Sequence, residues 1–231
     1  MMKMGAPLPP EELAAAAAEL GPMNEYMMEA LERKKQAPGD DLMSTLLAAE
    51  LDGRNVTDLN VLMLSTAVLV AGNGTTRNLL GGMVFSLATH PDQLAAVVAD
   101  RALAGGVVEE TLRWVTPVPG FLRTATRDTE IRGQEIRAGE HVYMMYMSAN
   151  WDEEIFEDPA RFDIARDVDP SHVSFGFGQH LCVGMSVARL EARVFIEELF
   201  DRFSGVELAG EPVRVRSVLE NAWSRLPVVF R

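Results

Sequence analysis

The stretch Ser174-Phe175-Gly176-Phe177-Gly178-Gln179-His180-Leu181-Cys182-Val183-Gly184 organises the sequence, because it contains the only cysteine of the chain. Its glycines let the backbone bend and approach another group closely. A helix predicted over 185–200 follows, so the thiol lies just before a helix N-terminus. Unpaired backbone N–H groups and the positive end of the helix dipole favour the thiolate there. This arrangement suits a soft, anionic metal ligand. The alternative is an inert, buried cysteine in a glycine-rich turn.

The pattern Phe175-x-x-Gly178-x-His180-x-Cys182-x-Gly184 resembles the haem-binding loop of bacterial cytochromes P-450. The resemblance implies that Cys182 is the axial ligand of haem iron, where a thiolate favours O–O cleavage. It also implies that Phe175 packs beside the sulfur and that His180 hydrogen-bonds a haem propionate. Gly178 and Gly184 would complete the cofactor-binding loop. The implied cofactor is haem b (heme b, iron protoporphyrin IX).

Charge and cysteine content restrict the possible partners. The net charge of −13 argues against binding to nucleic acid or to an anionic membrane surface. A single cysteine excludes an internal disulfide and fits a reducing compartment. The first residues lack the apolar segment of a secretory signal. The sequence therefore predicts a cytoplasmic protein with no nucleic-acid partner and no membrane partner.

A long apolar stretch predicts one buried helix over 58–89, which ends before Pro91. Its unbroken apolar length is too short for a membrane span, and Gly72, Gly74 and Arg77 interrupt it. The two glycines weaken the middle of the helix by about 1 kcal/mol each relative to alanine. Taken alone, they would indicate close packing against another helix.

The run Ala71-Gly72-Asn73-Gly74-Thr75-Thr76 resembles the central motif of the family's long distal helix. The resemblance implies that Ala71 and Gly72 open a groove for dioxygen over the iron. It also implies that Thr75 is a catalytic residue that helps to deliver protons. The family usually carries Asp or Glu just before this threonine, whereas Gly74 stands here. Because general acid–base help is typically worth about 10²–10⁴-fold in rate, oxygen activation would need water or another residue at this place.

Helices are also predicted on both sides of this motif. A helix over 11–20 is expected to be broken by Gly21-Pro22, and a second helix covers 24–36. Asp40 or Asp41 is expected to cap a third helix. The remaining predictions outside the sheet region are a turn at 51–54, a helix at 93–103 and a helix at 107–115.

Glu110 and Arg113 lie three residues apart, on the same face of the helix predicted at 107–115. An exposed pair of this kind contributes only a few tenths of a kcal/mol. In the family that the chain resembles, the pair is buried and joined by a third residue, which Arg161 matches here. The resemblance therefore implies a structural triad that supports the haem loop and takes no part in chemistry.

The segment 118–147 reads as β-rich. It contains a strand at 121–126, a hairpin at 131–136 with a glycine turn, and a buried strand at 141–147. Two further strands are predicted near the C-terminus, in segments 213–216 and 227–230.

Within this β-rich segment, Arg123 matches the arginine that contacts a haem propionate in the family. The alternative is a solvated strand arginine. The resemblance also implies that Val118 and Phe121 line the substrate pocket. Three histidines without metal-ligand spacing are expected at the surface or in loops: His90, His141 and His172.

The fold class expected from these observations is mainly α with small β-sheets, in the cytochrome P-450 fold with its amino-terminal part missing. Residues 1–231 would form the carboxy-terminal haem-binding portion. Its expected parts are the long distal helix about 58–89, the Glu-x-x-Arg helix about 107–115, the β-rich part 118–147, the haem-thiolate loop 174–184 and the following helix 185–200.

The leading functional hypothesis is a haem-thiolate monooxygenase, or the haem-binding portion of one. The resemblance implies that it uses O2, with electrons from NAD(P)H through a ferredoxin reductase and a ferredoxin, to hydroxylate a small apolar substrate. The alternative is a non-catalytic, truncated remnant that binds haem weakly or not at all, motivated by Gly74 and the missing amino-terminal part. A third hypothesis, an interaction module built on the helices before Thr57, has no positive feature in the sequence.

Overall fold

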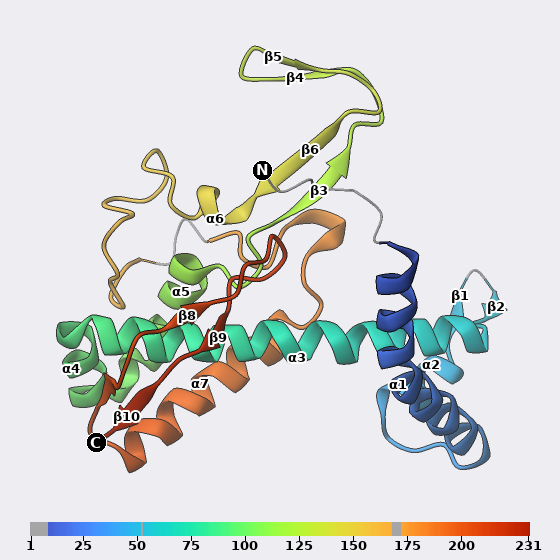
Figure 1. The fold of residues 1–231 in the computed structure, drawn as a ribbon, viewed down its shortest axis with the longest axis horizontal. Helices are drawn as coiled ribbons and strands as arrows, with labels where there is room; N and C mark the ends of the chain where they lie inside the picture. The colour runs from blue at the N-terminus through green and yellow to red at the C-terminus, as the bar shows by residue number, and fades with distance from the viewer. Residues whose placement is uncertain (1–8, 52, 168–171) are drawn as a thin grey trace. The chain divides into compact units, whose positions relative to one another are not determined.

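The computed structural model describes residues 9–51, 53–167 and 172–231 (Figure 1). The chain divides into two compact units, Met1–Ala71 and Gly72–Arg231. The helices are α1 (Pro10–Gln36), α2 (Leu42–Leu47), α3 (Asp58–Thr89), α4 (Pro91–Ala99), α5 (Ala104–Val115), α6 (Tyr146–Ala149) and α7 (Met185–Arg202), with 3-10 turns η1 (Arg101–Leu103) and η2 (Gly178–His180).

The strands of the described residues pair two by two, always antiparallel: β1 (Glu50–Leu51) with β2 (Arg54–Asn55), β3 (Gly120–Thr124) with β6 (His141–Met145), β4 (Thr129–Ile131) with β5 (Gln134–Ile136), β7 (Val206–Leu208) with β10 (Val228–Phe230), and β8 (Val213–Arg214) with β9 (Trp223–Arg225). Helices therefore carry most of the regular structure, and the expected class, mainly α with small sheets, is confirmed.

In the first unit, α1 continues through Pro22, so the predicted break at Gly21-Pro22 is wrong. An internal proline removes one backbone hydrogen bond and its ring presses on the preceding turn, at a cost of about 3 kcal/mol. Such a residue often kinks a helix without ending it. Figure 1 shows α1 bending part-way along its length.

A small core holds the first unit together. It contains Met27 and Leu31 of α1, Met43 of α2 and Val61 of α3, all buried. The predicted cap is confirmed, because the side chain of Asp41 accepts a hydrogen bond from the backbone N–H of Ser44 at 3.0 Å. The predicted turn at 51–54 joins β1 to β2, although Asp52 lies outside the described residues.

Helix α3 has the predicted bounds, but it is buried over only part of its length. Large apolar side chains of its first half are exposed: Leu59, Met63, Leu64, Val68, Leu69 and Val70. By length and composition α3 could cross a membrane, and only 6% of its most apolar stretch is buried. One such helix is weak evidence for a membrane span, because the core helices of many globular proteins pass the same test.

The core of the second unit lies between the C-terminal half of α3, α5 and α7 (Figure 1). Met83 of α3, Val107 of α5 and Ile196 of α7 are fully buried in it. Gly106 permits a close approach, because a Cβ atom there would lie 2.0 Å from the carbonyl oxygen of Ile164. This glycine lies inside α5, which begins at Ala104 and so starts earlier than predicted.

The predicted hairpin at 131–136 is confirmed by β4 and β5. Arg132 and Gly133 join these strands with φ of 48° and 81°, the positive values that a tight two-residue hairpin turn requires. The expectation of a buried strand at 141–147 is wrong. The residues of β6 are exposed or half-buried. In the described part of the chain β6 pairs with β3 alone, so it is an edge strand of a two-stranded sheet and no second strand flanks it.

Candidate functional site

The loop that carries Cys182 closes on itself through its backbone. The N–H of Cys182 donates to the carbonyl of Phe175 at 2.9 Å, and the N–H of Leu181 donates to that of Gly178 at 3.1 Å. Gly176 and Gly178 have φ of 69° and 67°, a region that residues with a side chain rarely adopt. These two glycines therefore permit the sharp reversal that leaves the thiol of Cys182 exposed.

Helix α7 begins at Met185, close behind this thiol, as predicted. Gly184 is its N-cap and supplies no side-chain hydrogen bond. A Cβ atom at Gly184 would lie 3.9 Å from the sulfur of Cys182. The sulfur therefore lies next to the first turn of α7, and a side chain at position 184 would contact it.

Behind the loop, the ring of Phe175 packs against a charged cluster. The guanidinium of Arg189 lies 4.7 Å from the ring centroid of Phe175. The carboxylate of Glu109 accepts hydrogen bonds from Nε of Arg189 at 2.7 Å and from Nε2 of His172 at 3.2 Å. His172 lies in a loop, which is one of the two positions expected for it, but its side chain is only 5% exposed and so does not lie at the surface.

The Glu109 carboxyl has a strongly altered acidity. Burial alone would raise its pKa above the ordinary value of 4.5. The hydrogen bonds from His172 and Arg189, together with their charges, outweigh this effect and lower the pKa to about 2. The carboxylate therefore stays ionised across the physiological range. It ties α5 to α7 and to the segment before the cysteine loop.

Glu110 and Arg113 form the predicted buried pair. Nε and Nη2 of Arg113 lie 2.8 Å from Oε2 and Oε1 of Glu110, and both side chains are almost completely buried. The third partner differs from the prediction. Arg166 reaches Oε2 of Glu110 at 3.2 Å, whereas the guanidinium of Arg161 is 62% exposed and pairs with Asp163. Arg161 joins the network of Glu110 through its backbone carbonyl, which accepts a hydrogen bond from Arg113. Its side chain points into solvent.

Asn150 fixes the start of the loop to the end of α5. Its Oδ1 accepts from the N–H of Val173, and its Nδ2 donates to Thr116 and to Ser174, each at 2.8 Å. The hydroxyl of Ser174 donates to the carbonyl of Leu112 at 2.6 Å. Since Asn150 is completely buried, these bonds hold the loop on a rigid support.

The residues predicted on the β-rich side lie on or next to β3. Arg123 is half-buried, and within the described residues no carboxylate pairs with it. The ring of Phe121 is 44% exposed and lies 6.0 Å from the ring of Tyr146. The hydroxyl of Tyr146 lies 3.3 Å from the place of a Cβ atom at Gly176, which links this side to the loop. Val118 is half-buried beside this strand.

The predicted distal motif lies in α3, where Ala71 is the last residue of the first unit and Gly72 the first of the second. Among the described residues, no atom lies within 4 Å of a Cβ built at Gly72, so space is open beside the helix. Thr75 is half-buried in the following turn.

These residues fit a flat, apolar, iron-bearing group. The donor set offers an exposed thiol at Cys182, and a Cβ built at Gly178 would also meet open space. Phe177, Leu181 and Val183 are 64%, 46% and 94% exposed, which leaves an apolar surface around the sulfur for such a group to cover. His180 is exposed and half-buried Arg123 is a cation, so both suit propionate groups.

Residues 18–216 match the family model of cytochrome P-450. The chain belongs to the cytochrome P-450 family. Members of this family bind haem b.

Two curated relatives and one solved structure show how far this membership extends. Cytochrome P-450-terp of Pseudomonas sp is 40% identical over 197 residues, 85% of this chain and 46% of the relative. The steroid C26-monooxygenase of Mycolicibacterium smegmatis is 40% identical over 209 residues, 89% of this chain and 52% of the relative. The structure of cytochrome P-450 CYP109Q5 from Chondromyces apiculatus superposes with a TM-score of 0.87 at 39% identity, covering 95% of this chain and 56% of that one. The chain thus spans about half the length of the curated relatives it matches.

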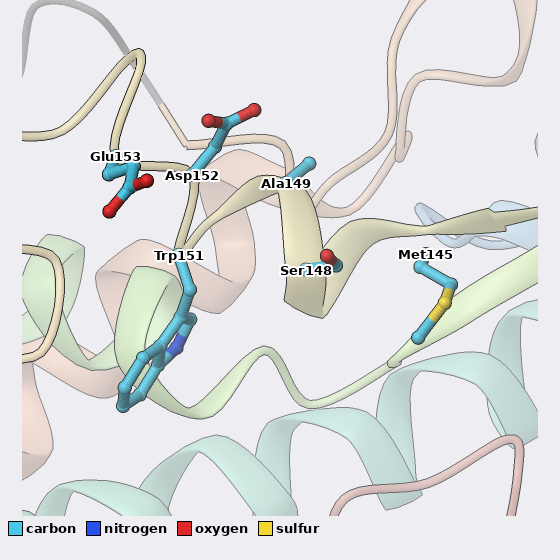
Figure 2. A pocket seen from close by; sticks show the side chains of 6 residues that line it. All are labelled: Met145, Ser148, Ala149, Trp151, Asp152 and Glu153. Carbon is cyan, nitrogen blue, oxygen red and sulfur yellow. The ribbon is translucent and has the colours of Figure 1, made fainter.

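A shallow pocket of about 510 Å³ lies at the end of β6. Figure 2 shows Ser148 and Ala149 between Met145 and Trp151, with the carboxylates of Asp152 and Glu153 at one side. This lining does not overlap with the residues predicted for the cytochrome P-450 haem site. In the described part of the chain, the thiol of that site faces an open surface and not this pocket.

Three contacts of this cytochrome P-450 chain had no signal in the sequence. They are the ion pair of Arg166, the cluster of Glu109 with His172 and Arg189, and the tilted contact between the rings of Trp151 and Trp114, whose centroids lie 4.4 Å apart. Each brings together residues from distant segments without a fixed spacing, so no periodicity or motif could have revealed it.

Proposed function

We propose that this chain is the haem-binding portion of a haem-thiolate monooxygenase. The observation that carries the proposal is the Cys182 loop: an exposed thiol, held by a backbone bond to Phe175 and set against the first turn of α7. Haem bound there would supply the activation of O2. The family that the chain belongs to supports the same chemistry.

The chain's own residues have distinct roles in this proposal. Cys182 holds the iron, with Gly178 and Gly184 keeping the loop close. His180 and Arg123 hold the propionates by charge-assisted hydrogen bonds. Ala71 and Gly72 keep the groove over the haem open, and Thr75 helps to pass protons into it. Val118 and Phe121 exclude water from the substrate.

The proposed reaction inserts one oxygen atom of O2 into a C–H bond and reduces the other to water. Two electrons come from NAD(P)H through a ferredoxin reductase and a ferredoxin that docks near Cys182. We propose a small apolar substrate, supported by exposed Phe121 and by a relative that is named a steroid C26-monooxygenase. We also propose a cytoplasmic location without a membrane partner, in line with the net charge of −13.

An absorption spectrum tests the cofactor. The purified chain, supplied with haem, reduced and exposed to CO, is expected to show the red-shifted Soret band of a thiolate-bound haem. Cys182→Ser should abolish that band, while a neighbouring control, Ser186→Ala, should retain it. Absence of the band in the unsubstituted chain would refute haem-thiolate ligation.

The second candidate is a non-catalytic chain that binds haem weakly or not at all. One observation favours it: Gly74 stands where the family usually carries an acid. It predicts no NAD(P)H-dependent oxygen consumption when a ferredoxin and its reductase are added. Oxygen consumption that depends on Cys182 would reject this candidate.

A further inference from the structure

A carboxylate from the C-terminal part of the chain lies beside the glycine that precedes Thr75. Oε1 of Glu220 is 3.3 Å from the place of a Cβ atom at Gly74. Its other oxygen, Oε2, lies 3.5 Å from Nδ2 of Asn78, a buried residue one helical turn further on. Glu220 therefore lies along the face of α3 that positions 74 and 78 share.

The turn that carries Glu220 is firmly held. The hydroxyl of Ser217 accepts from the backbone N–H of Leu219 at 3.1 Å and from that of Glu220 at 3.2 Å. The next residue, Asn221, donates its backbone N–H to the carbonyl of Pro117 at 2.9 Å. Its side chain also donates to the carbonyl of Val115. This anchoring fixes where the carboxylate of Glu220 can reach.

Strands β8 and β9, on either side of the turn that carries Glu220, form a hairpin that continues along α3. In Figure 1, β8 and β9 run across this helix. The ring of Trp223 lies 4.9 Å from that of Phe85 and 3.9 Å from the place of a Cβ atom at Gly81. Positions 74, 78, 81 and 85 form one stripe of the helix, and the hairpin covers the whole stripe. The approach of Glu220 to α3 is thus part of an extended contact.

The carboxylate is also chemically available. Within the described residues, no lysine, arginine or histidine forms an ion pair with Glu220. Glu220 is half-buried, so part of the residue is accessible to water. A side chain longer than that of glycine at position 74 would crowd it, since 3.3 Å is already a tight contact for a Cβ atom.

We propose that Glu220 supplies the acid that is missing at position 74, acting through solvent and Thr75. This inference rests on the proposed monooxygenase function. The balanced reaction is RH + O2 + NAD(P)H + H⁺ → ROH + H2O + NAD(P)⁺. Two protons reach oxygen in each turnover, and Glu220 recovers each proton that it gives from water. Its own charge state is therefore the same at the end as at the start.

The first test measures the contact without any enzymatic activity. Gly74→Ala is introduced into the unsubstituted chain and into Glu220→Ala, and the urea midpoint of unfolding is measured for all four proteins. Alanine favours a helix more than glycine does. We expect Gly74→Ala to raise the midpoint clearly in the Glu220→Ala background and much less in the presence of Glu220. Equal shifts in the two backgrounds would overturn the proposed contact.

The second test measures proton supply. The haem-loaded chain is given NADH, ferredoxin reductase and ferredoxin, and oxygen consumption is followed in H2O and D2O. Glu220→Gln is expected to lower the rate by about 100-fold, as for loss of a general acid, and to increase the solvent isotope effect. The CO-bound spectrum should be unchanged. Glu211→Gln, which removes an exposed carboxylate that precedes β8, is the charge-matched control and should keep the full rate.

A purely structural role is distinguished by moving the acid. Gly74→Asp combined with Glu220→Ala, which removes the side chain that position 74 would otherwise crowd, returns a carboxylate to α3 and should recover most of the lost rate. Failure of this rescue, or a full rate in Glu220→Gln, would overturn the role of Glu220 and leave the monooxygenase function standing. An unsubstituted chain that consumes no oxygen would instead refute the proposed function itself, and this inference with it.

Discussion

At the scale of single residues, the support behind the cysteine loop depends on Glu110. Its carboxylate is almost completely buried and accepts from two arginines, Arg113 and Arg166. Removing one partner of a buried charge leaves the other without compensation, which costs far more than losing an exposed pair. The two arginines of segment 159–167 should therefore differ sharply in their effect on stability.

Arg166→Ala is expected to lower the free energy of unfolding by about 2–4 kcal/mol, because it leaves Glu110 underpaired. Arg161→Ala is the matched control and should cost no more than about 0.5 kcal/mol, since its guanidinium is 62% exposed. Urea unfolding of both variants checks this. An Arg161 variant as unstable as the Arg166 variant would contradict the assignment of the third partner.

Glu109 predicts a pH dependence of stability. Its pKa is about 2 in the folded chain, against an ordinary value of 4.5. A carboxyl with a lowered folded pKa stabilises the fold above its unfolded pKa, and this contribution is lost as the pH falls. Between pH 4.5 and about 2 the chain should therefore lose about 1–2 kcal/mol through this group, after allowance for its partial exposure.

Glu109→Gln should remove this part of the acid sensitivity, whereas Glu191→Gln, an exposed position on α7, should leave it intact. Unfolding in urea at several pH values between 2 and 6 measures the difference. Identical pH profiles for the Gln variant at 109 and the unsubstituted chain would show that the contacts of Glu109 with His172 and Arg189 contribute nothing.

At the scale of elements, local signals predicted bounds well and tertiary partners poorly. Helix α3 was predicted because an apolar run lies between a helix start at Asp58 and a stop before Pro91, and the hairpin at Gly133 because its turn demands positive φ. The role of Arg161 was misjudged and the burial of the His172 side chain within its loop was not predicted, since both depend on segments that only the fold brings together.

Pro22 illustrates the same limit, because a helix on both sides of a proline can continue through it. Pro22→Ala restores one backbone hydrogen bond and is expected to stabilise α1 by about 1–3 kcal/mol. Pro10→Ala is the control, since a proline in the first turn of a helix loses no such bond. Thermal melts followed by far-UV circular dichroism compare the two, and equal melts would contradict this account of α1.

At the scale of the whole molecule, the described first half of α3 exposes apolar side chains that a closed core would bury. Leu64 and Val68 lie one helical turn apart and are 48% and 46% exposed. Exposed apolar patches of this kind bind other apolar surfaces. The burial that the sequence led us to expect for this helix could not be judged from its pattern, because a pattern shows which face is apolar and not what covers it.

The chain is therefore expected to bind a hydrophobic dye and to self-associate at high concentration. Leu64→Glu combined with Val68→Glu should reduce dye fluorescence several-fold and shift sedimentation toward the monomer. Ile131→Glu, at an exposed apolar position in the β4–β5 hairpin, is the control and should change neither. Equal dye binding in all three proteins would contradict this view of α3.

The exposed sulfur of Cys182 has a practical consequence, because the sequence contains no second thiol. A maleimide can modify the chain at one atom only, so mass spectrometry should find a single adduct and no mixture. Whatever covers that atom, whether a pigment or a protein partner, must slow the modification. The rate of alkylation therefore reports, in any buffer and without a spectrum, how much of this surface is occupied.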